Sequence, residues 1–225
     1  MDVYIAGKKI RIDPARALGK GGEADVFDIG AGKALKIFKA PDHPDYQLDN
    51  TAQQAARERL DTHQTKLREF PLNLPLRVVT PEELATDKSG KRIVGYSMPL
   101  LTSAEVLLRF ADRGFRQAGV AHDTVLQVFR DLHTSVGGIH KAGVVIGDFN
   151  DLNILVRGEQ AYLIDADSFQ FGKYICGVFT ARFVDPLICD PALEALMMCR
   201  PHTENSDWYA FAVMLMQCLL FVDPY

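Results

Sequence analysis

Three polar side chains in the second half of the chain stand between apolar stretches, at a spacing that could do chemistry. Asp148 lies five residues before Asn153, and Asp165 follows an apolar run at 162–164. The apolar runs 154–156 and 162–164 flank a short polar turn, which predicts a β-hairpin with Asn153 and Asp165 at neighbouring ends. Single Asp or Asn residues in turns are commonly structural, but the ordered set suits Mg²⁺ with a phosphorylated substrate.

A glycine-rich segment lies between two expected strands near the N-terminus. Residues 18–27 read Leu-Gly-Lys-Gly-Gly-Glu-Ala-Asp-Val-Phe. Glycines let a backbone turn tightly and approach phosphate oxygens, although a glycine-rich hairpin turn is the commoner explanation when the pattern stands alone. The segment opens no helix with Gly-Lys-Ser/Thr and begins no βαβ unit, so neither a P-loop nor a Rossmann motif is present.

A lysine stands within the next apolar strand, at residues 33–38. In an alternating strand Ala34, Lys36 and Phe38 share one face. A lysine on an apolar face needs an anionic partner or ligand. The alternative is an edge-strand lysine whose ammonium group reaches water.

The elements that must position these residues differ between the two halves. Short strands are expected at 3–5, 10–12, 24–29 and 33–38 as an antiparallel meander, followed by a helix over 49–70 and strands at 74–84 and 92–101. Beyond Thr102, apolar residues spaced three and four apart predict a helix around 125–139, and a second apolar helix covers 207–222. The pattern indicates an α+β chain in two lobes.

Composition excludes several classes of protein. The 225 residues carry 25 Lys and Arg against 29 Asp and Glu, a net charge of −4, which argues against a protein that mainly grips nucleic acid. The four cysteines form no Cys-x-x-Cys pair, which favours reduced, buried thiols. No secretory signal opens the chain, and the longest apolar stretch, 210–222, is shorter than the roughly 20 residues of a membrane span. We therefore expect a cytoplasmic protein without membrane contact.

Taken in order, these motifs resemble the protein-kinase fold over nearly the whole chain. Residues 19–26 resemble the glycine-rich loop, 34–36 the Val-Ala-Ile-Lys strand, 147–153 the catalytic loop, 165–167 the Asp-Phe-Gly motif and 206–213 the helix that follows the activation segment. The resemblance implies a bilobal fold, with an N-lobe of antiparallel sheet and one long helix at 1–101 and a hinge at about 97–102. The mainly helical C-lobe at 102–225 is expected to be truncated after the αF-like helix at 207–222, where most kinases continue with further helices. The sequence 165–172 with 182–186 is similar to a divergent bacterial serine/threonine kinase-like group.

The resemblance also implies roles for the chemical residues. Lys36 would hold the α- and β-phosphates of ATP, paired with a glutamate on the long helix. Glu58 is the better candidate because it lies mid-helix, and Glu69, beside a Phe-Pro break, is the alternative. Asp148 would accept the proton of the substrate hydroxyl. The metal, Mg²⁺ or alternatively Mn²⁺, would be held by Asn153 and Asp165.

The nucleotide site implied by the resemblance lies mainly in the N-lobe. The backbone around Met98 and Leu100 would hydrogen-bond adenine as the hinge. The remaining residues implied to contact ATP are Gly19, Lys20, Gly21, Gly22, Val26 and Ala34.

Several positions depart from the kinase pattern and leave other functions open. Ala24 replaces the third loop glycine, Asn150 replaces the catalytic-loop lysine, and Asp167 replaces the glycine of Asp-Phe-Gly. The leading hypothesis is a protein kinase acting on Ser/Thr hydroxyls of protein substrates. The alternatives are a small-molecule phosphotransferase and a nucleotide-binding pseudokinase scaffold. The 207–222 helix lacks its usual cover, so a C-terminal domain, a partner or a dimer is expected on it.

Overall fold

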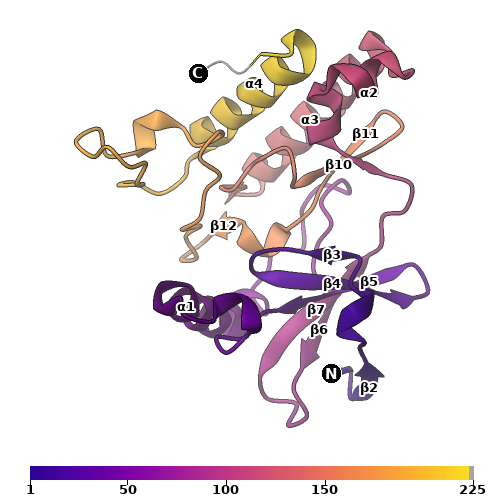
Figure 1. Ribbon diagram of the computed structural model, residues 1–225, viewed down its shortest axis with the longest axis vertical. Coiled ribbons are helices and arrows are strands. Elements are labelled where there is room, and N and C mark those ends of the chain that lie inside the picture. The colour runs from indigo at the N-terminus through magenta and orange to yellow at the C-terminus, as the bar shows by residue number, and fades with distance from the viewer. Residues whose placement is uncertain (223–225) are drawn as a thin grey trace. The chain divides into compact units, whose positions relative to one another are not determined.

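The computed structural model describes residues 1–222, and the chain divides into two units (Figure 1). The first unit comprises Met1–Phe70 and Thr80–Leu101, and the second comprises Pro71–Val79 and the chain from Thr102 onward. Residues 71–79, expected in the first lobe, belong to the second unit, because Val79 N donates to Leu163 O at 2.8 Å and Arg77 pairs with Asp131 at 3.1 Å.

The first unit is built on a seven-stranded antiparallel sheet with strand order β2-β1-β6-β7-β5-β4-β3. The β1–β2 hairpin and the β3–β4 pair lie at opposite edges, so the expected continuous meander over the first forty residues is wrong. The strands run Asp2–Ile5 (β1), Lys8–Arg11 (β2), Gly19–Lys20 (β3), Ala24–Gly30 (β4), Lys33–Phe38 (β5), Glu83–Thr86 (β6) and Ile93–Pro99 (β7).

The alternation predicted for β5 is present in the sheet. Leu35 and Ile37 belong to the apolar cluster on one face, whereas Phe38 packs on the other face against His63, with 4.6 Å between ring centroids. The strand expected at 74–84 does not form, and β6 begins only at Glu83. Pro75 and Pro81 interrupt that stretch, and proline has no N–H for a sheet ladder.

Helix α1 (Asn50–Lys66) packs against β7. Its N-terminus is capped by Asp49, whose Oδ1 accepts a hydrogen bond from Ala52 N at 2.9 Å. The helix ends four residues before the expected Phe70. Its buried side chains recur every three or four residues, as one helical face requires, and they are Ala56, Leu60, His63 and Lys66.

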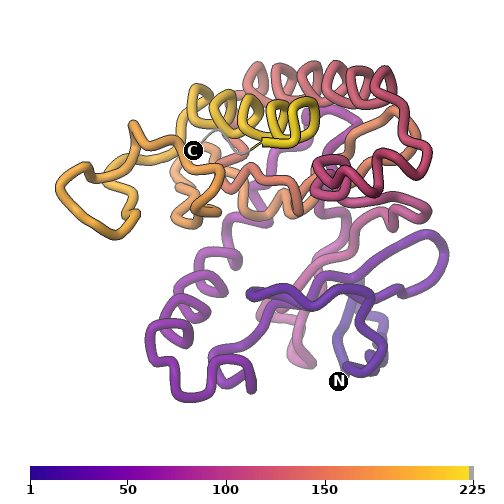
Figure 2. Tube along the Cα trace, turned by 45° about the horizontal axis from the view of Figure 1, so that its top comes forward, coloured from indigo at the N-terminus to yellow at the C-terminus, as the bar shows by residue number. Residues whose placement is uncertain are grey.

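In the second unit, helices α3 (His122–Lys141) and α4 (Glu204–Leu220) lie side by side (Figure 2). Phe129 of α3 meets Phe211 of α4 edge-on at 5.5 Å, and His133 meets Trp208 at 4.8 Å. The first helix was predicted around 125–139 from apolar spacing, and the second at 207–222 from its apolar composition. Thr203 and Ser206 form a reciprocal capping box that begins α4.

Short elements complete the second unit. The predicted hairpin is formed by β10 (Ile154–Arg157) and β11 (Gln160–Leu163), with β8 (Glu105–Val106) beside β10. Strand β9 (Val144–Val145) pairs with β12 (Gln170–Phe171). The remaining elements are α2 (Arg113–Gln117) and the 3-10 turns Pro14–Arg16, Pro44–Tyr46, Leu107–Ala111, Ala166–Ser168 and Pro186–Ile188. Within residues 1–222 no helix combines the length and the apolar character that crossing a membrane requires.

Candidate functional site

The β10–β11 hairpin brings Asn153 and Asp165 to its neighbouring ends, as predicted. Ile154 pairs with Leu163, and Ile164 N donates to Asn153 O at 2.9 Å, so Asp165 directly follows the end of this ladder. Asp165 has left-handed backbone angles, φ 65° and ψ 31°. Ser168 holds this strained residue by donating to Asp165 O through both its amide (3.0 Å) and its hydroxyl (2.8 Å).

Asp148 lies beside the same hairpin. Asn153 Nδ2 donates to Asp148 O at 3.0 Å, which ties the two residues together. The carboxylate of Asp148 is half-buried and accepts a hydrogen bond from the hydroxyl of Thr180, at 2.8 Å between Oγ1 and Oδ1. The second unit therefore holds an aspartate that already accepts a hydrogen bond from an alcohol.

Asn150, the residue that replaces the catalytic-loop lysine, stabilises this loop through hydrogen bonds of its buried side chain. Its Nδ2 donates to Asp148 O and to Thr180 Oγ1, both at 3.1 Å. Its Oδ1 accepts from Leu152 N at 3.0 Å and from Asn153 N at 3.2 Å. From the sequence, Asn150 is expected only as a replacement of the catalytic-loop lysine that could lower the transfer rate or require another cation. The preference of Asn for turns in which its side chain caps following amides was the available signal for its structural role.

The start of the catalytic loop is held by Asp207, which is fully buried. Its carboxylate accepts hydrogen bonds from Ile146 N at 2.8 Å and Gly147 N at 3.0 Å, and it contacts His140 Nε2 at 2.8 Å. Gly147 has φ +81°, and a Cβ there would lie 2.7 Å from Cys176 Cβ. Sequence reasoning assigned no role to Asp207 or His140, because their partners are distant in the chain.

Asp151 is a second buried carboxylate of this loop. It is 3% exposed, and burial raises its pKa, opposed by Arg182, whose Nη2 lies 2.6 Å from Oδ2. Burial thus disfavours the charged form of this carboxylate, and Arg182 is the largest of the contacts that favour it.

The donor set of the second unit suits Mg²⁺. The amide of Asn153 uses Nδ2 on Asp148 O, so its oxygen remains for a cation, and Asp165 supplies carboxylate oxygens. Over residues 1–222 there is no group of three or more His, Cys, Asp or Glu arranged for a metal. A cation here would thus rely on two protein side chains together with phosphate and water oxygens, as Mg²⁺ commonly does.

In the first unit, the sheet register brings the predicted nucleotide residues into rows across the strands. Gly19 pairs with Val26, and Val26 pairs with Lys36. Ala34 pairs with Met98 on β7, and both are buried. Lys36 is 6% exposed, with Nζ 6.0 Å from the ring centroid of Tyr96.

Three other predicted residues are placed differently from the expectation. Glu58 lies on the exposed side of α1 and accepts a hydrogen bond from Gln54 at 2.8 Å, so its expected pair with Lys36 is not formed in this structure. The alternative, Glu69, is also exposed and lies beyond the end of α1. Leu100 N donates to Gly32 O at 2.8 Å. An adenine ring would have to use other backbone groups of the hinge.

The glycine-rich loop forms a tight, solvent-exposed turn. Gly19 and Lys20 form β3, Gly21 N donates to Ala24 O at 2.9 Å, and all of residues 18–22 are exposed. Ala24, in place of a third glycine, is 5% exposed and fits within the sheet.

The arrangement of strands, loops and helices is a protein-kinase-like fold, and comparisons with known proteins agree. The ROP18 kinase domain, solved in complex with AMP-PNP and sucrose, matches with a TM-score of 0.63 over 100% of this chain and 68% of that one, at 15% identity. No protein-family model matches the sequence.

Three curated relatives are also protein kinases by name. The chain is 29% identical over 219 residues to protein kinase YegI of Escherichia coli O157:H7 and 28% identical over 215 residues to YegI of Escherichia coli strain K12. These alignments cover 92% and 91% of this chain and 31% of each relative. Serine/threonine-protein kinase ISR1 of Eremothecium gossypii is 26% identical over 225 residues, covering 93% of this chain and 58% of ISR1. The chain thus spans about a third of the length of the YegI proteins.

Proposed function

We propose that this chain is the catalytic domain of a protein kinase that transfers the γ-phosphoryl group of ATP to Ser or Thr hydroxyls. The observation that carries the proposal is the hydrogen bond from the Thr180 hydroxyl to Asp148 Oδ1 at 2.8 Å. A carboxylate that accepts from an alcohol at this distance meets the geometric requirement for a general base. The kinase names of the relatives support the same class of reaction.

In the proposed reaction, Asp148 orients the substrate hydroxyl and receives its proton as the new O–P bond forms and the bond to the ADP oxygen breaks. Asn153 and Asp165 would hold Mg²⁺, which supplies charge neutralisation on the phosphates. Lys36, a buried residue of strand β5, would bind the α- and β-phosphates. Val26, Ala34 and Met98 would contact the adenine ring. The chemistry asked of the protein is mainly positioning and charge stabilisation.

A second candidate is a nucleotide-binding pseudokinase, and Asn150 favours it. Phosphotransferases of this pattern use a lysine at this position to contact the transferred phosphate. The Asn150 side chain is instead buried, and both its donor and its acceptor groups form hydrogen bonds with the loop. Without that cation the transfer rate would fall unless another group supplies the charge.

The test is phosphoryl transfer by the purified chain with [γ-³²P]ATP and Mg²⁺ or Mn²⁺, given a generic basic protein and, separately, a panel of hydroxylated metabolites. We expect label on Ser/Thr of the protein substrate and at least 10²-fold less with Asp148→Ala. Asp123→Ala, an exposed acid in the first turn of α3, is the matched control and should retain full activity. Label on a metabolite would favour the small-molecule phosphotransferase, and an ATP-dependent rise in melting temperature without label would favour the pseudokinase.

A further inference from the structure

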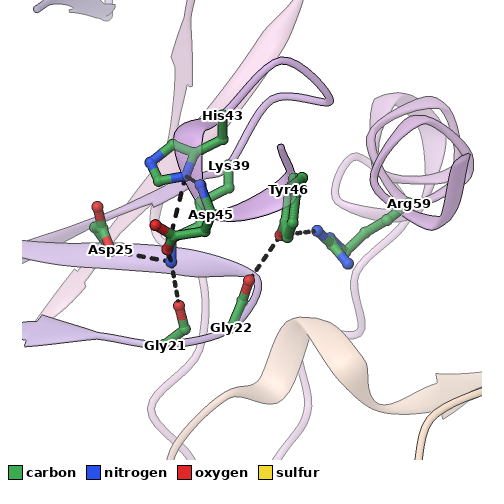
Figure 3. A network of polar contacts seen from close by, with 8 residues as sticks. All are labelled: Gly21, Gly22, Asp25, Lys39, His43, Asp45, Tyr46 and Arg59. Carbon is green, nitrogen blue, oxygen red and sulfur yellow. Dashed lines mark hydrogen bonds and ion pairs between the residues drawn. The ribbon is translucent and has the colours of Figure 1, made fainter. Parts of the chain in front are cut away.

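Consecutive carbonyl groups of the glycine-rich loop are held by groups outside it (Figure 3). Lys39 Nζ donates to Gly21 O at 2.6 Å, and Tyr46 OH donates to Gly22 O at 2.7 Å. The backbone N–H of Lys39 donates to Glu23 O at 2.9 Å. Lys39 and Tyr46 are 5% and 8% exposed, whereas both glycines are exposed. Two buried side chains therefore fix a backbone segment that faces solvent.

Each of the two anchoring side chains is itself held by charged neighbours. Lys39 Nζ pairs with the carboxylate of Asp45 and lies 3.8 Å from Asp25 Oδ1. The hydrogen bond from Lys39 lowers the pKa of Asp45 and so favours the charged form of that carboxylate.

Tyr46 is connected to the long helix of the first unit. Its hydroxyl accepts from Arg59 Nη2 of α1 at 3.1 Å, and Arg59 Nη1 pairs with Glu23 Oε1 at 2.8 Å. The loop is thus attached to α1 both through its backbone, at Gly22, and through its Glu23 side chain. Figure 3 shows this chain of contacts running from Gly22 through Tyr46 to Arg59.

The direction of these carbonyl groups decides the direction of the amides that follow them. In a planar trans peptide the N–H points opposite to the C=O of the same unit. Carbonyls of Gly21 and Gly22 aimed at Lys39 and Tyr46 therefore aim the N–H groups of Gly22 and Glu23 away from these anchors. Within residues 1–222 neither amide donates to a protein acceptor. Successive N–H groups presented in this way form a site for an anion.

We propose that Lys39 and Tyr46 are positioning residues that preset the Gly22 and Glu23 amides for the β- and γ-phosphates of ATP. The inference rests on the proposed function, because it assigns the nucleotide phosphates to these amides. A glycine-rich turn left to itself samples many conformations, and ordering it upon binding would weaken affinity. Anchors that order the loop beforehand remove that cost.

The sharpest test is Tyr46→Phe, which deletes one hydroxyl and keeps the ring. We expect Kd for Mg·ATP to rise about 5- to 10-fold, because the loop loses the ordering that the hydroxyl provides, an effect of about the size of one hydrogen bond. Kd for AMP, which has no β- or γ-phosphate, should change less than twofold. Tyr4→Phe is the matched control, since the Tyr4 hydroxyl makes no hydrogen bond within the described part of the chain. Equal losses for ATP and AMP, or no loss for either, would overturn the inference.

A second variant tests the lysine anchor. Lys39→Met alone would leave two carboxylates without their cation, so we combine it with Asp45→Asn and follow the melting temperature. We expect the Kd ratio of AMP to ATP to fall about 5-fold or more, and Asp45→Asn alone to change it less than twofold. An unchanged ratio in the folded double variant would contradict the role of Lys39.

The two proposals fail in different ways. A wild-type chain that binds neither ATP nor AMP would overturn the proposed function and this inference with it. A wild-type chain that binds ATP, with Tyr46→Phe binding it equally well, would overturn the inference alone.

Discussion

The catalytic loop of the second unit and the glycine-rich loop of the first are held in opposite ways. The fully buried carboxylate of Asp207 accepts hydrogen bonds from two backbone amides at the start of the catalytic loop. The glycine-rich loop is held by its carbonyl oxygens, through Lys39 and Tyr46, and the partner of Lys39 is the half-exposed Asp45. The catalytic loop is therefore anchored within a core, and the glycine-rich loop is anchored at the border of one.

The difference has an energetic consequence. Charge-assisted hydrogen bonds inside a low-dielectric core are strong, and their loss leaves amides that water cannot reach. Bonds at the surface exchange with water at little cost. We therefore expect the buried anchor of the catalytic loop to contribute more to stability than the partly buried anchors that preset the glycine-rich loop. Four measurements test this contrast.

The largest effect is expected from Asp207→Ala. This change leaves Ile146 N, Gly147 N and His140 without their acceptor inside the core, and we expect the free energy of unfolding to fall by about 3–5 kcal/mol. Urea denaturation measures it, with Asp123→Ala as the exposed control. A loss below about 1 kcal/mol would show that the catalytic loop does not depend on a core anchor.

A large effect is also expected from Gly95→Ala in strand β7, which pairs with β5, the strand that carries Lys36. A Cβ at Gly95 would lie 2.1 Å from Lys36 O, so β5 and β7 would have to separate. We expect a loss of about 2–3 kcal/mol in urea denaturation. Gly19→Ala is the control, because its Cβ would meet no atom within 4 Å. Equal stability of the two variants would mean that the sheet is more compliant than the packing indicates.

Arg182→Gln should have a moderate, pH-dependent effect. The folded pKa of Asp151 is raised by burial and kept down in part by Arg182. For an acid with a raised pKa, stability falls as pH rises from the unfolded pKa, 3.8, through the folded pKa. Removing Arg182 raises that pKa further, so the variant should lose stability on going from pH 4 to pH 7.

Because Arg182 is half-exposed, we expect a loss of only about 1 kcal/mol at pH 7. The measurement is urea denaturation at both pH values, with the exposed Arg130→Gln as the control. A variant that is destabilised equally at pH 4 and pH 7 would show that the contact with Asp151 is not electrostatic.

The smallest effect is expected from Glu58→Gln. Glu58 is exposed and bonded to Gln54, so the rate of phosphoryl transfer should change less than twofold. The matched change at Lys36, Lys36→Met, should abolish transfer if the proposed function holds. A loss of more than tenfold in Glu58→Gln would show that α1 rotates to form the expected ion pair during the reaction.

Much of the site could be predicted because its parts are local in sequence. The hairpin and the positions of Asn153 and Asp165 follow from two apolar runs around a short turn, and the β5 alternation places Lys36 on the face of Phe38. Such patterns reflect strand periodicity and turn chemistry, which act over a few residues.

The boundaries and the face of α1 were less predictable. A helix with few apolar residues has no strong amphipathic pattern, so nothing in its sequence distinguishes a buried Glu58 from an exposed one. The prolines that end the expected 74–84 strand were visible, but the pairing of that segment with α3 and β11 was not.

What the sequence determined by itself is the order of elements and the identity of the acidic and amide side chains around the catalytic loop, because these depend on local periodicity and residue chemistry. The tertiary structure alone decided that Asp207 holds this loop from sixty residues away, that Asn150 braces it, and that Lys39 and Tyr46 hold the glycine-rich loop. Each of these contacts joins a side chain to a backbone group, and a backbone group carries no signature in the sequence that names its partner.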